Sequence, residues 1–311
     1  MSDKILSLED ATRKLEDTGF RFNKAGQLHY HMRNDDKPYE YNQRPDDQEF
    51  NQCVFDIIAE DVLKYVFSLL VHQEGLLCAT IPLNKKEELG HATSFIFHSP
   101  NLSSYEKLLV LIQGSGEVRA GIWSRKLTLT HSLESGTQIP FIQRAKQLGY
   151  GVVVLNPNQN KNDKFQKVVE GSETPEAHFT YVWRNFVKPS KVKHVAIVAH
   201  SYGGVITMKG AAEIKSVSKR TFAVAFTDSV HDLQLQMSDK QCKKLAPWIT
   251  NNTKNWVCSQ KSLNTKEEEV REIDSPRVSA GTTVHQETSW KAFDAVWEFI
   301  EKKAIKLPTK K

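Results

Sequence analysis

The spacing of hydrophobic residues changes along the chain and predicts two kinds of element. Residues 47–72 place apolar side chains at intervals of three and four, the period of an amphipathic helix, with Asp46 or Asp47 available as its N-cap. Earlier in the chain, residues 20–22 and 28–30 flank a turn centred on Ala25-Gly26. That pattern predicts a β-hairpin that decorates the edge of the fold.

Downstream of residue 75, short apolar runs alternate with helical patterns. Strands are predicted at 76–81, 94–98, 108–112, 151–155, 194–199, 221–227, 256–259 and 277–279. Helices are predicted at 137–148, 175–186, 202–215, 241–250 and 290–304. This alternation indicates right-handed crossovers and a mostly parallel central sheet with helices on both faces, an α/β fold. Residues 159–173 are polar, lysine-rich and aperiodic, which predicts a surface loop, with a lid or binding loop as the alternative.

Polar residues follow several of these predicted strands directly. They are Gln113-Gly114-Ser115-Gly116, Asn156, Ser201, Asp228 and His285. In a doubly wound sheet the reactive groups collect at the carboxyl ends of the strands. We therefore expect these residues to form a single site.

Ser201 has the strongest local pattern. The run from Ala199 to Gly203 reads small-x-Ser-x-Gly after a buried strand and before a helix, which is the nucleophile elbow of the α/β-hydrolase fold. In that turn the serine takes a strained backbone conformation, and the amide of Tyr202 at the helix N-terminus can face an oxyanion. The alternative is an ordinary serine in a tight turn between a strand and a helix.

Asp228 and His285 are the candidate partners of Ser201. They follow it in the order serine, acid, histidine that α/β-hydrolases use, and a serine needs a base oriented by an acid to become a nucleophile. Asp228 falls one strand earlier than the usual acid position if 256–259 is a strand. His231 and Asp232 are competing candidates, and His285 could instead be a surface histidine.

The glycine-rich run after the strand at 108–112 predicts the rest of an oxyanion site. Gly114 and Ser115 would bring backbone N–H groups close to a substrate, together with the amide of Tyr202. The Gly-x-Gly is too short for a dinucleotide fingerprint. We therefore predict no nucleotide cofactor.

Composition narrows the class of protein. The 311 residues are 39% hydrophobic and 25% charged, which fits one globular domain and excludes wholesale disorder. We divide the chain into an N-terminal extension with a hairpin (1–45), an α/β-hydrolase-like domain (46–305) and a basic tail (306–311). The net charge of +5 is a weak indication of nucleic acid, and the lysines near the C-terminus fit a solvated tail. That group consists of Lys302, Lys303, Lys306, Lys310 and Lys311.

The four cysteines are far apart and form no Cys-x-x-Cys pair, so no metal site is predicted and all four are expected to be reduced. No stretch approaches the roughly 18 apolar residues that cross a bilayer, and no secretory signal or retention motif is evident. A nuclear or cytoplasmic protein without a membrane partner is expected.

Several longer runs closely resemble the argonaute-binding-protein-two (Arb2) family, in its vertebrate cotranscriptional-regulator branch. The runs are 109–121, 135–142, 149–158, 199–204, 227–231 and 276–281. The resemblance extends over residues 19–299. Members of the family carry His-Gly-Ser-Gly where this chain begins with Gln113, and they have a longer charged insertion at 159–173. The chain therefore looks like a divergent paralogue.

The resemblance implies an α/β-hydrolase-like domain in proteins of the nucleus, with the cytoplasm as a second location. The implied partners are Argonaute and chromatin or splicing factors, with small RNA as a further associate. The implied processes are small-RNA-directed heterochromatin formation and alternative splicing. Catalysis is not an established role of the family, so a serine hydrolase of ester or amide type is the alternative function.

Overall fold

The computed structural model describes residues 5–31, 37–162, 166–268, 271 and 273–307. Its centre is an eight-stranded sheet in the order β3-β4-β6-β5-β9-β10-β11-β12. The strands are β3 (Leu77–Ile81), β4 (Ser94–His98), β5 (Lys107–Ile112), β6 (Tyr150–Val154), β9 (His194–His200), β10 (Thr221–Thr227), β11 (Thr253–Val257) and β12 (Arg277–Ser279). The pairs β3/β4 and β4/β6 are antiparallel, and the pairs from β6 to β12 are parallel. This is the strand arrangement of the α/β-hydrolase fold, as predicted.

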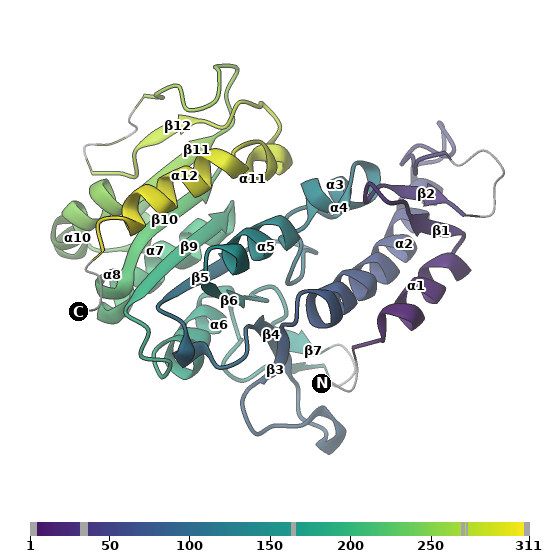
Figure 1. Ribbon diagram of the computed structural model, residues 1–311, viewed down its shortest axis with the longest axis horizontal. Helices are drawn as coiled ribbons and strands as arrows, with labels where there is room; N and C mark the ends of the chain where they lie inside the picture. The colour runs from purple at the N-terminus through teal and green to yellow at the C-terminus, as the bar shows by residue number, and fades with distance from the viewer. Residues whose placement is uncertain (1–4, 32–36, 163–165, 269–270, 272, 308–311) are drawn as a thin grey trace.

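Helices cover both faces of the sheet, and this explains why the strands are continuously apolar. Neighbouring residues of β5 face opposite layers: Leu109 and Leu111 belong to one buried cluster, and Leu108 and Val110 belong to the other. The first layer contains α2 (Gln48–Ser68), α5 (Ile139–Gln147) and α12 (Phe293–Ala304). The second contains α6 (Pro175–Val182), α7 (Tyr202–Glu213) and α10 (Asp239–Asn252). In Figure 1, α5 and α12 cross the near side of the sheet.

The long N-terminal helix forms as the spacing predicts. Asp47 is its N-cap and accepts a hydrogen bond from the backbone N–H of Phe50. The α-helix ends at Ser68, and one π-helical turn, η2 (Leu69–Gln73), continues it to one residue beyond the predicted end. Its buried side chains, Val62 and Val66 among them, lie in the same cluster as the inner face of the sheet.

The predicted hairpin is present as β1 (Phe20–Phe22) and β2 (Leu28–Tyr30), an antiparallel pair in its own two-stranded sheet. It does not extend the edge of the main sheet. Phe20 and Leu28 are buried in the same cluster as α2, so the N-terminal segment shares the core of the domain. Figure 1 shows the hairpin beside α1 (Leu8–Asp17) and α2, far from β12.

Some local elements differ from the sequence prediction. The segment 159–173 is not without structure, because β7 (Lys161–Asn162) and β8 (Lys167–Val168) pair within it. The predicted C-terminal helix is divided at Ala292 into α11 (Thr288–Lys291) and α12. The sequence patterns also missed α1, α3 (Arg125–Thr130), α4 (Leu133–Gly136), α8 (Lys215–Arg220) and α9 (Leu233–Gln236). All but α1 have four to six residues, too few to show a hydrophobic period.

The remaining predictions on the fold concern the ends of the chain and the membrane. Lys310 and Lys311 of the predicted basic tail lie outside the described residues. Within the part of the chain that the structure describes, no helix is both long and apolar enough to cross a bilayer.

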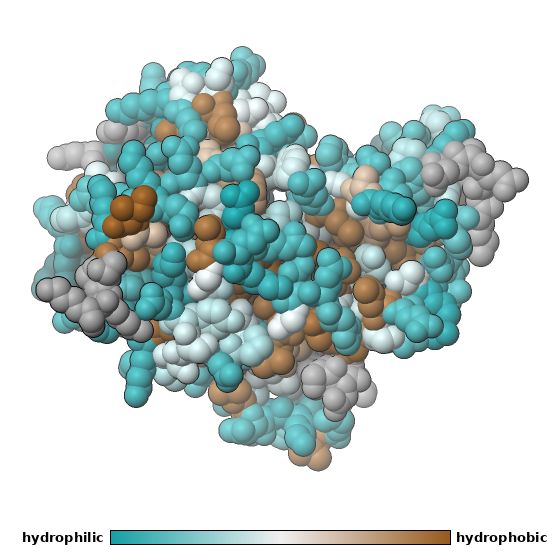
Figure 2. Space-filling view, in the orientation of Figure 1, coloured by the Kyte–Doolittle hydropathy of each residue, from teal (hydrophilic) through white to brown (hydrophobic). Residues whose placement is uncertain are grey.

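Figure 2 shows a face that is largely hydrophilic, with hydrophobic side chains between the N-terminal elements and the sheet.

Candidate functional site

Ser201 lies on a sharp turn between β9 and α7. Its φ of 52° and ψ of −118° are strained for a residue with a Cβ atom. The backbone N–H of Ser201 donates to Thr227 O (3.1 Å), and its carbonyl accepts from the N–H of Gly204 (3.1 Å), so the turn is held on both sides. This is the elbow geometry that the sequence predicts.

The two glycines after Ser201 are required by close packing. A Cβ atom on Gly203 would lie 2.6 Å from the carbonyl oxygen of Ile112, and one on Gly204 would lie 1.7 Å from Ser229 Oγ. Neither position has room for a side chain. The small residues of the motif therefore allow the elbow to pack against β5 and against the loop that follows β10.

Gly114 brings the loop after β5 against the elbow. A Cβ atom on Gly114 would lie 3.0 Å from Ser201 Cβ and 3.5 Å from Ser201 Oγ. The loop is held by Asn158, whose side-chain amide donates to the carbonyls of Gly114 (2.8 Å) and Val118 (2.9 Å). Ser115, the next residue, is exposed. The backbone of this loop therefore lies beside the Ser201 hydroxyl.

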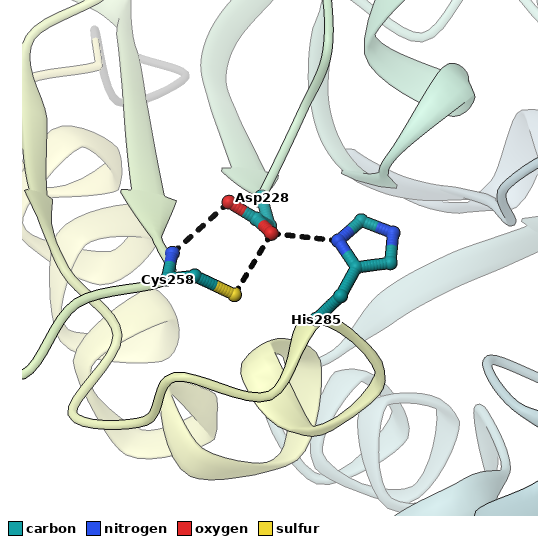
Figure 3. Close-up of side chains that lie close together, drawn as sticks. All are labelled: Asp228, Cys258 and His285. Carbon is teal, nitrogen blue, oxygen red and sulfur yellow. Dashed lines mark hydrogen bonds and ion pairs between the residues drawn. The ribbon is translucent and has the colours of Figure 1, made fainter.

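Asp228 and His285 form a short hydrogen bond at the centre of the site. The Nδ1 atom of His285 lies 2.6 Å from Oδ2 of Asp228, and Figure 3 shows the second ring nitrogen, Nε2, directed away from the carboxylate. Asp228 directly follows β10, and His285 opens a single helical turn after β12. The imidazole remains accessible, with 43% of the side chain exposed, whereas Asp228 is 21% exposed.

Cys258 completes the environment of Asp228. Its backbone N–H donates to Oδ1 (3.0 Å) and its thiol donates to Oδ2 (2.9 Å), as Figure 3 shows. Burial raises the pKa of Asp228, but the hydrogen bonds from His285 and Cys258 outweigh it and lower that pKa to about 2. Burial and the adjacent carboxylate raise the pKa of the Cys258 thiol to about 12. The acid is therefore ionised and the thiol protonated at neutral pH.

His285 lies beside the elbow rather than in direct contact with the Ser201 hydroxyl. Its ring packs on His200, the residue before Ser201, with ring centroids 4.7 Å apart. Among the residues that the structure describes, the Ser201 hydroxyl has no hydrogen-bond partner. The structure thus joins acid to imidazole beside the serine elbow, without a hydrogen bond between Ser201 and His285.

Tyr202 is the first residue of α7, so its amide lies at the helix N-terminus next to Ser201. Its hydroxyl donates to Oε1 of Glu176 (2.7 Å), and this hydrogen bond raises the pKa of Tyr202 to about 12. The side chain therefore ties α7 to α6, and only the backbone amide is available to the site.

A protein-family model for the Arb2 domain matches residues 11–263. The chain belongs to the Arb2 domain family. A chicken (Gallus gallus) protein, cotranscriptional regulator ARB2A homolog, is 34% identical over 96% of this chain and 83% of its own length. The human (Homo sapiens) cotranscriptional regulator ARB2A is 35% identical over 92% of this chain and 79% of its own length.

Among solved structures, the histone deacetylase Clr3 is similar to this Arb2 domain over 81% of the chain, with a TM-score of 0.53 and 17% identity. The similar part is 39% of the Clr3 chain. At this identity the likeness concerns the fold alone. The Arb2 match includes Ser201, Asp228 and Cys258 and ends before His285.

Gln113 directly follows β5 and opens the glycine-containing loop that packs against the elbow. The side chain is fully buried, and neither its amide nitrogen nor its amide oxygen has a partner among the described residues. An unpaired buried amide is costly. The structure gives Gln113 no role in holding the loop, which depends instead on Asn156 and Asn158.

The structure assigns other contacts to the competing candidates. His231 is buried, with Nδ1 2.7 Å from Ser229 Oγ and Nε2 3.3 Å from Asp274 Oδ1. Asp232 caps α9 and pairs with Arg271 (2.6 Å). Asn156, singled out at a strand exit, accepts from the backbone N–H of Ala120 (3.1 Å), which is a structural contact.

The sequence patterns missed Cys258 and Asn158. The cysteine spacing predicts an isolated thiol at Cys258, although this residue directly follows β11, the strand after which α/β-hydrolases usually carry the acid. Because β11 is a strand, Asp228 does lie one strand earlier than that position. Reactive groups collect at the carboxyl ends of parallel strands, and this holds for β11 as it does for β10, so the same reasoning identifies Cys258 as a candidate.

The same three side chains are the nearest approach to a metal site in the described residues. One ligand atom from each of Asp228, Cys258 and His285 lies within 4.8 Å of the others. The contacts of 2.6 Å and 2.9 Å to Oδ2 are hydrogen-bond distances, whereas ligands of a tetrahedral zinc stand about 3.4 Å apart or more. As arranged here, the group is a hydrogen-bonded network.

Proposed function

We propose that this chain is a nuclear co-transcriptional regulator that works with Argonaute and with chromatin or splicing factors, and that uses its α/β-hydrolase-like domain as a binding scaffold. The support is membership of the Arb2 family, with 34–35% identity to proteins named cotranscriptional regulators over at least 92% of the chain. Small-RNA-directed heterochromatin formation and alternative splicing are the processes proposed. In this proposal the domain 46–305 is the scaffold, and the segment 1–45 is its N-terminal extension.

Co-purification from nuclear extract tests this function. The tagged full chain is expected to enrich Argonaute together with chromatin or splicing factors. The Ser201→Ala variant is expected to enrich the same proteins, because a scaffold does not require the hydroxyl. If neither class of protein is enriched over a tag-only control, or if the chain is absent from the nuclear fraction, the regulator proposal is wrong.

A second function, hydrolysis of an ester or amide by Ser201, is supported by one observation: the 2.6 Å contact between His285 and Asp228 beside a strained serine elbow. In this proposal Ser201 Oγ attacks the substrate carbonyl carbon and its proton passes to Nε2 of His285. Asp228 holds the imidazole and stabilises its charged form. The backbone N–H groups of Tyr202 and of the loop at Gly114 and Ser115 would face the developing oxyanion.

The remaining steps conserve atoms and protons. The imidazolium returns its proton to the alcohol or amine as the carbon–heteroatom bond breaks, leaving an acyl group on Ser201. Water then attacks the acyl carbon while His285 accepts its proton, and collapse of the second oxyanion releases the acid and restores the serine. Formation of the hydrogen bond between Ser201 and His285 is the step required first, since catalytic hydrogen bonds often tighten only with substrate bound.

A fluorophosphonate probe tests the second function directly, because it reacts covalently with activated serines. Wild-type protein is expected to be labelled at Ser201, and both Ser201→Ala and His285→Asn are expected to lose labelling. Ser103→Ala is the matched control, since Ser103 is an exposed serine at the opposite end of the sheet. Absence of labelling under conditions that label a known esterase would exclude hydrolysis and leave the scaffold proposal intact.

A further inference from the structure

The opposite edge of the sheet carries a basic concavity. Two adjoining hollows of about 630 Å³ and about 440 Å³ open at the amino ends of β5, β9 and β10, and they share Lys191, Lys193, His194 and Leu307. We call the two hollows together the basic groove. Figure 1 shows its surroundings, with α8, α10 and the last described turn of the chain gathered near the C mark.

The polar lining of the basic groove is strongly positive. Its cationic side chains are Lys107, Lys191, Lys193, Lys219 and Arg220, and in the part of the chain that the structure describes Glu106 is the one acidic side chain that lines it. Among these described residues, none of the five cations lies within 4.0 Å of a carboxylate. Most charged surfaces mix the two signs, so a concavity lined in this way attracts anions.

Arg220 and Lys107 are partly buried, whereas the other three cations are exposed. The Arg220 guanidinium donates to the carbonyls of Val187 (3.0 Å) and Lys188 (3.3 Å), while its Nε atom is buried without a partner among the described residues. Arg220 therefore adds a fixed positive charge beneath the groove that no neighbouring acid neutralises. Both of its terminal nitrogens already donate to the backbone.

The charges around the groove also affect one another. The pKa of His194 is lowered, first by burial and then by the positive charge of Lys193. Beyond Leu307, which lines both hollows, burial and then the charges of Lys306 and Lys254 lower the pKa of Lys303. These shifts show that the lysines repel one another, and a bound anion would relieve that repulsion.

We infer that the basic groove binds the phosphate backbone of a single-stranded nucleic acid. Several separate lysine ammonium groups suit phosphates spaced along a flexible strand, because each acts as a point charge without a fixed geometry. Trp248 is partly exposed in the larger hollow and gives it apolar surface beside the charges, whereas Phe222 lies deeper, buried in the core. Aromatic side chains beside a positive groove are the usual composition of a single-strand binding site.

The shape and the donors of the groove argue against other polyanions. Recognition of carboxylates in an acidic peptide favours bidentate arginine, and the one guanidinium here is committed to backbone carbonyls. A lipid bilayer is flat, whereas this surface is concave. A single strand can follow the hollow and expose its phosphates on both sides.

The groove is separate from the candidate hydrolase site, and the inference does not depend on either proposed function. β9 runs from His194 at the groove to His200 beside Ser201, a length of about 20 Å. A bound strand would therefore leave Ser201 accessible. Labelling of Ser201 and binding of nucleic acid can be measured independently, so failure of one leaves the other standing.

Fluorescence anisotropy with a labelled 20-nucleotide oligouridine tests the inference on the full chain. The wild type is expected to bind, and its affinity is expected to fall as salt rises from 50 to 200 mM. The variant Lys191→Glu/Lys193→Glu is expected to bind at least about tenfold more weakly. Its affinity should also depend less on salt: the slope of log binding constant against log salt concentration should shrink by roughly 0.7 for each phosphate that the protein no longer neutralises. Unfolding temperatures of the variants establish that they are folded.

The matched control is Lys24→Glu/Lys126→Glu, which makes the same change in net charge at two exposed lysines near the hairpin and α3. It is expected to change the affinity less than twofold. Equal losses in both double variants would mean that overall charge alone attracts the RNA and would overturn the groove. Binding that does not depend on salt would also overturn the inference. The same holds if the protein binds phosphatidylserine vesicles or polyglutamate and oligouridine does not displace it from them.

Discussion

The carboxylate of Asp228 and the imidazole of His285 meet at 2.6 Å although 57 residues separate them in the chain. They follow β10 and β12, and β11 lies between these strands in the sheet. The contact therefore spans the end of β11, where Cys258 supplies two hydrogen bonds to the same carboxylate. The acid, at the end of β10, is oriented by groups that follow the next two strands of the sheet.

Asp228→Asn is expected to keep the shape of the site and to remove its negative charge. The amide has nearly the same volume, but it no longer stabilises a positive imidazole and it favours the wrong tautomer of His285. We expect the rate of fluorophosphonate labelling at Ser201 to fall about 10³-fold to 10⁴-fold, by analogy with the acid of other serine hydrolases. Unchanged labelling would remove Asp228 from the hydrolase proposal.

Cys258→Ala removes the thiol donor and keeps the backbone N–H. The pKa of Asp228 is expected to rise, because one of the hydrogen bonds that lower it is lost. A titration that follows the Asp228 carboxyl by NMR measures this change. Cys258→Ser keeps a donor at the same position and is expected to restore most of the lowering of the Asp228 pKa. Identical titrations of the wild type and both variants would contradict a role of the thiol in lowering this pKa.

Gly204→Ala is expected to destabilise the protein by about 2–4 kcal/mol, because the new methyl group would lie 1.7 Å from Ser229 Oγ. The free energy of unfolding in urea gives the value. Adding Ser229→Gly should recover a large part of the loss, since it removes the atoms that clash. If the second change recovers nothing, the strain lies in the backbone of α7 instead.

Stability is expected to fall as the pH drops from 7 to 5 because two histidines are buried in the neutral form. Burial lowers the pKa of His178 to about 3, and burial with the charge of His285 lowers that of His200 to about 4. The pKa of each histidine is lower in the folded state than in the unfolded state, where it is near 6.5. The stability linked to the neutral imidazole is therefore fully present above pH 6.5 and is lost as the pH falls toward the pKa of the folded state. Each histidine should contribute about 2 kcal/mol of this loss.

Urea unfolding at the two pH values measures the effect. The variant His200→Asn has no titrating group at this position and should lose correspondingly less stability between pH 7 and pH 5. A wild-type stability that stays constant over this range would show that the two imidazoles titrate alike in the folded and unfolded chains.

Gln113→Met is expected to stabilise the fold by about 1–2 kcal/mol, because it replaces two unpaired buried polar atoms with an apolar side chain of similar length. Gln143→Met is the comparison. Gln143 donates to Oε1 of Glu74 at 2.8 Å, so its loss should destabilise the protein by about 1 kcal/mol. Thermal and urea unfolding of both variants tests the contrast, and a destabilising Gln113→Met would show that the amide is satisfied in solution.

Much of the site could be located from sequence because parallel strands buried on both faces are continuously apolar. The run 221–227 coincides with β10, so Asp228 is identifiable as the residue at its exit. The elbow around Ser201 depends on local sterics, which the glycines at 203 and 204 reveal. His285 follows from its order in the chain. Chain order places it after β12 but does not say which carboxylate it meets.

The amino-acid sequence by itself determined the layers, the strands and the residues that leave them, since these depend on hydrophobic period and local backbone geometry. Only the tertiary structure decided which of the residues that follow the strands come into contact. The bonds from Cys258 to Asp228 depend on the pairing of β10 with β11, and the basic groove depends on three strand starts, two helices and the last turn of the chain lying together. Such contacts are fixed by how the layers bury one another, and no local pattern encodes that arrangement.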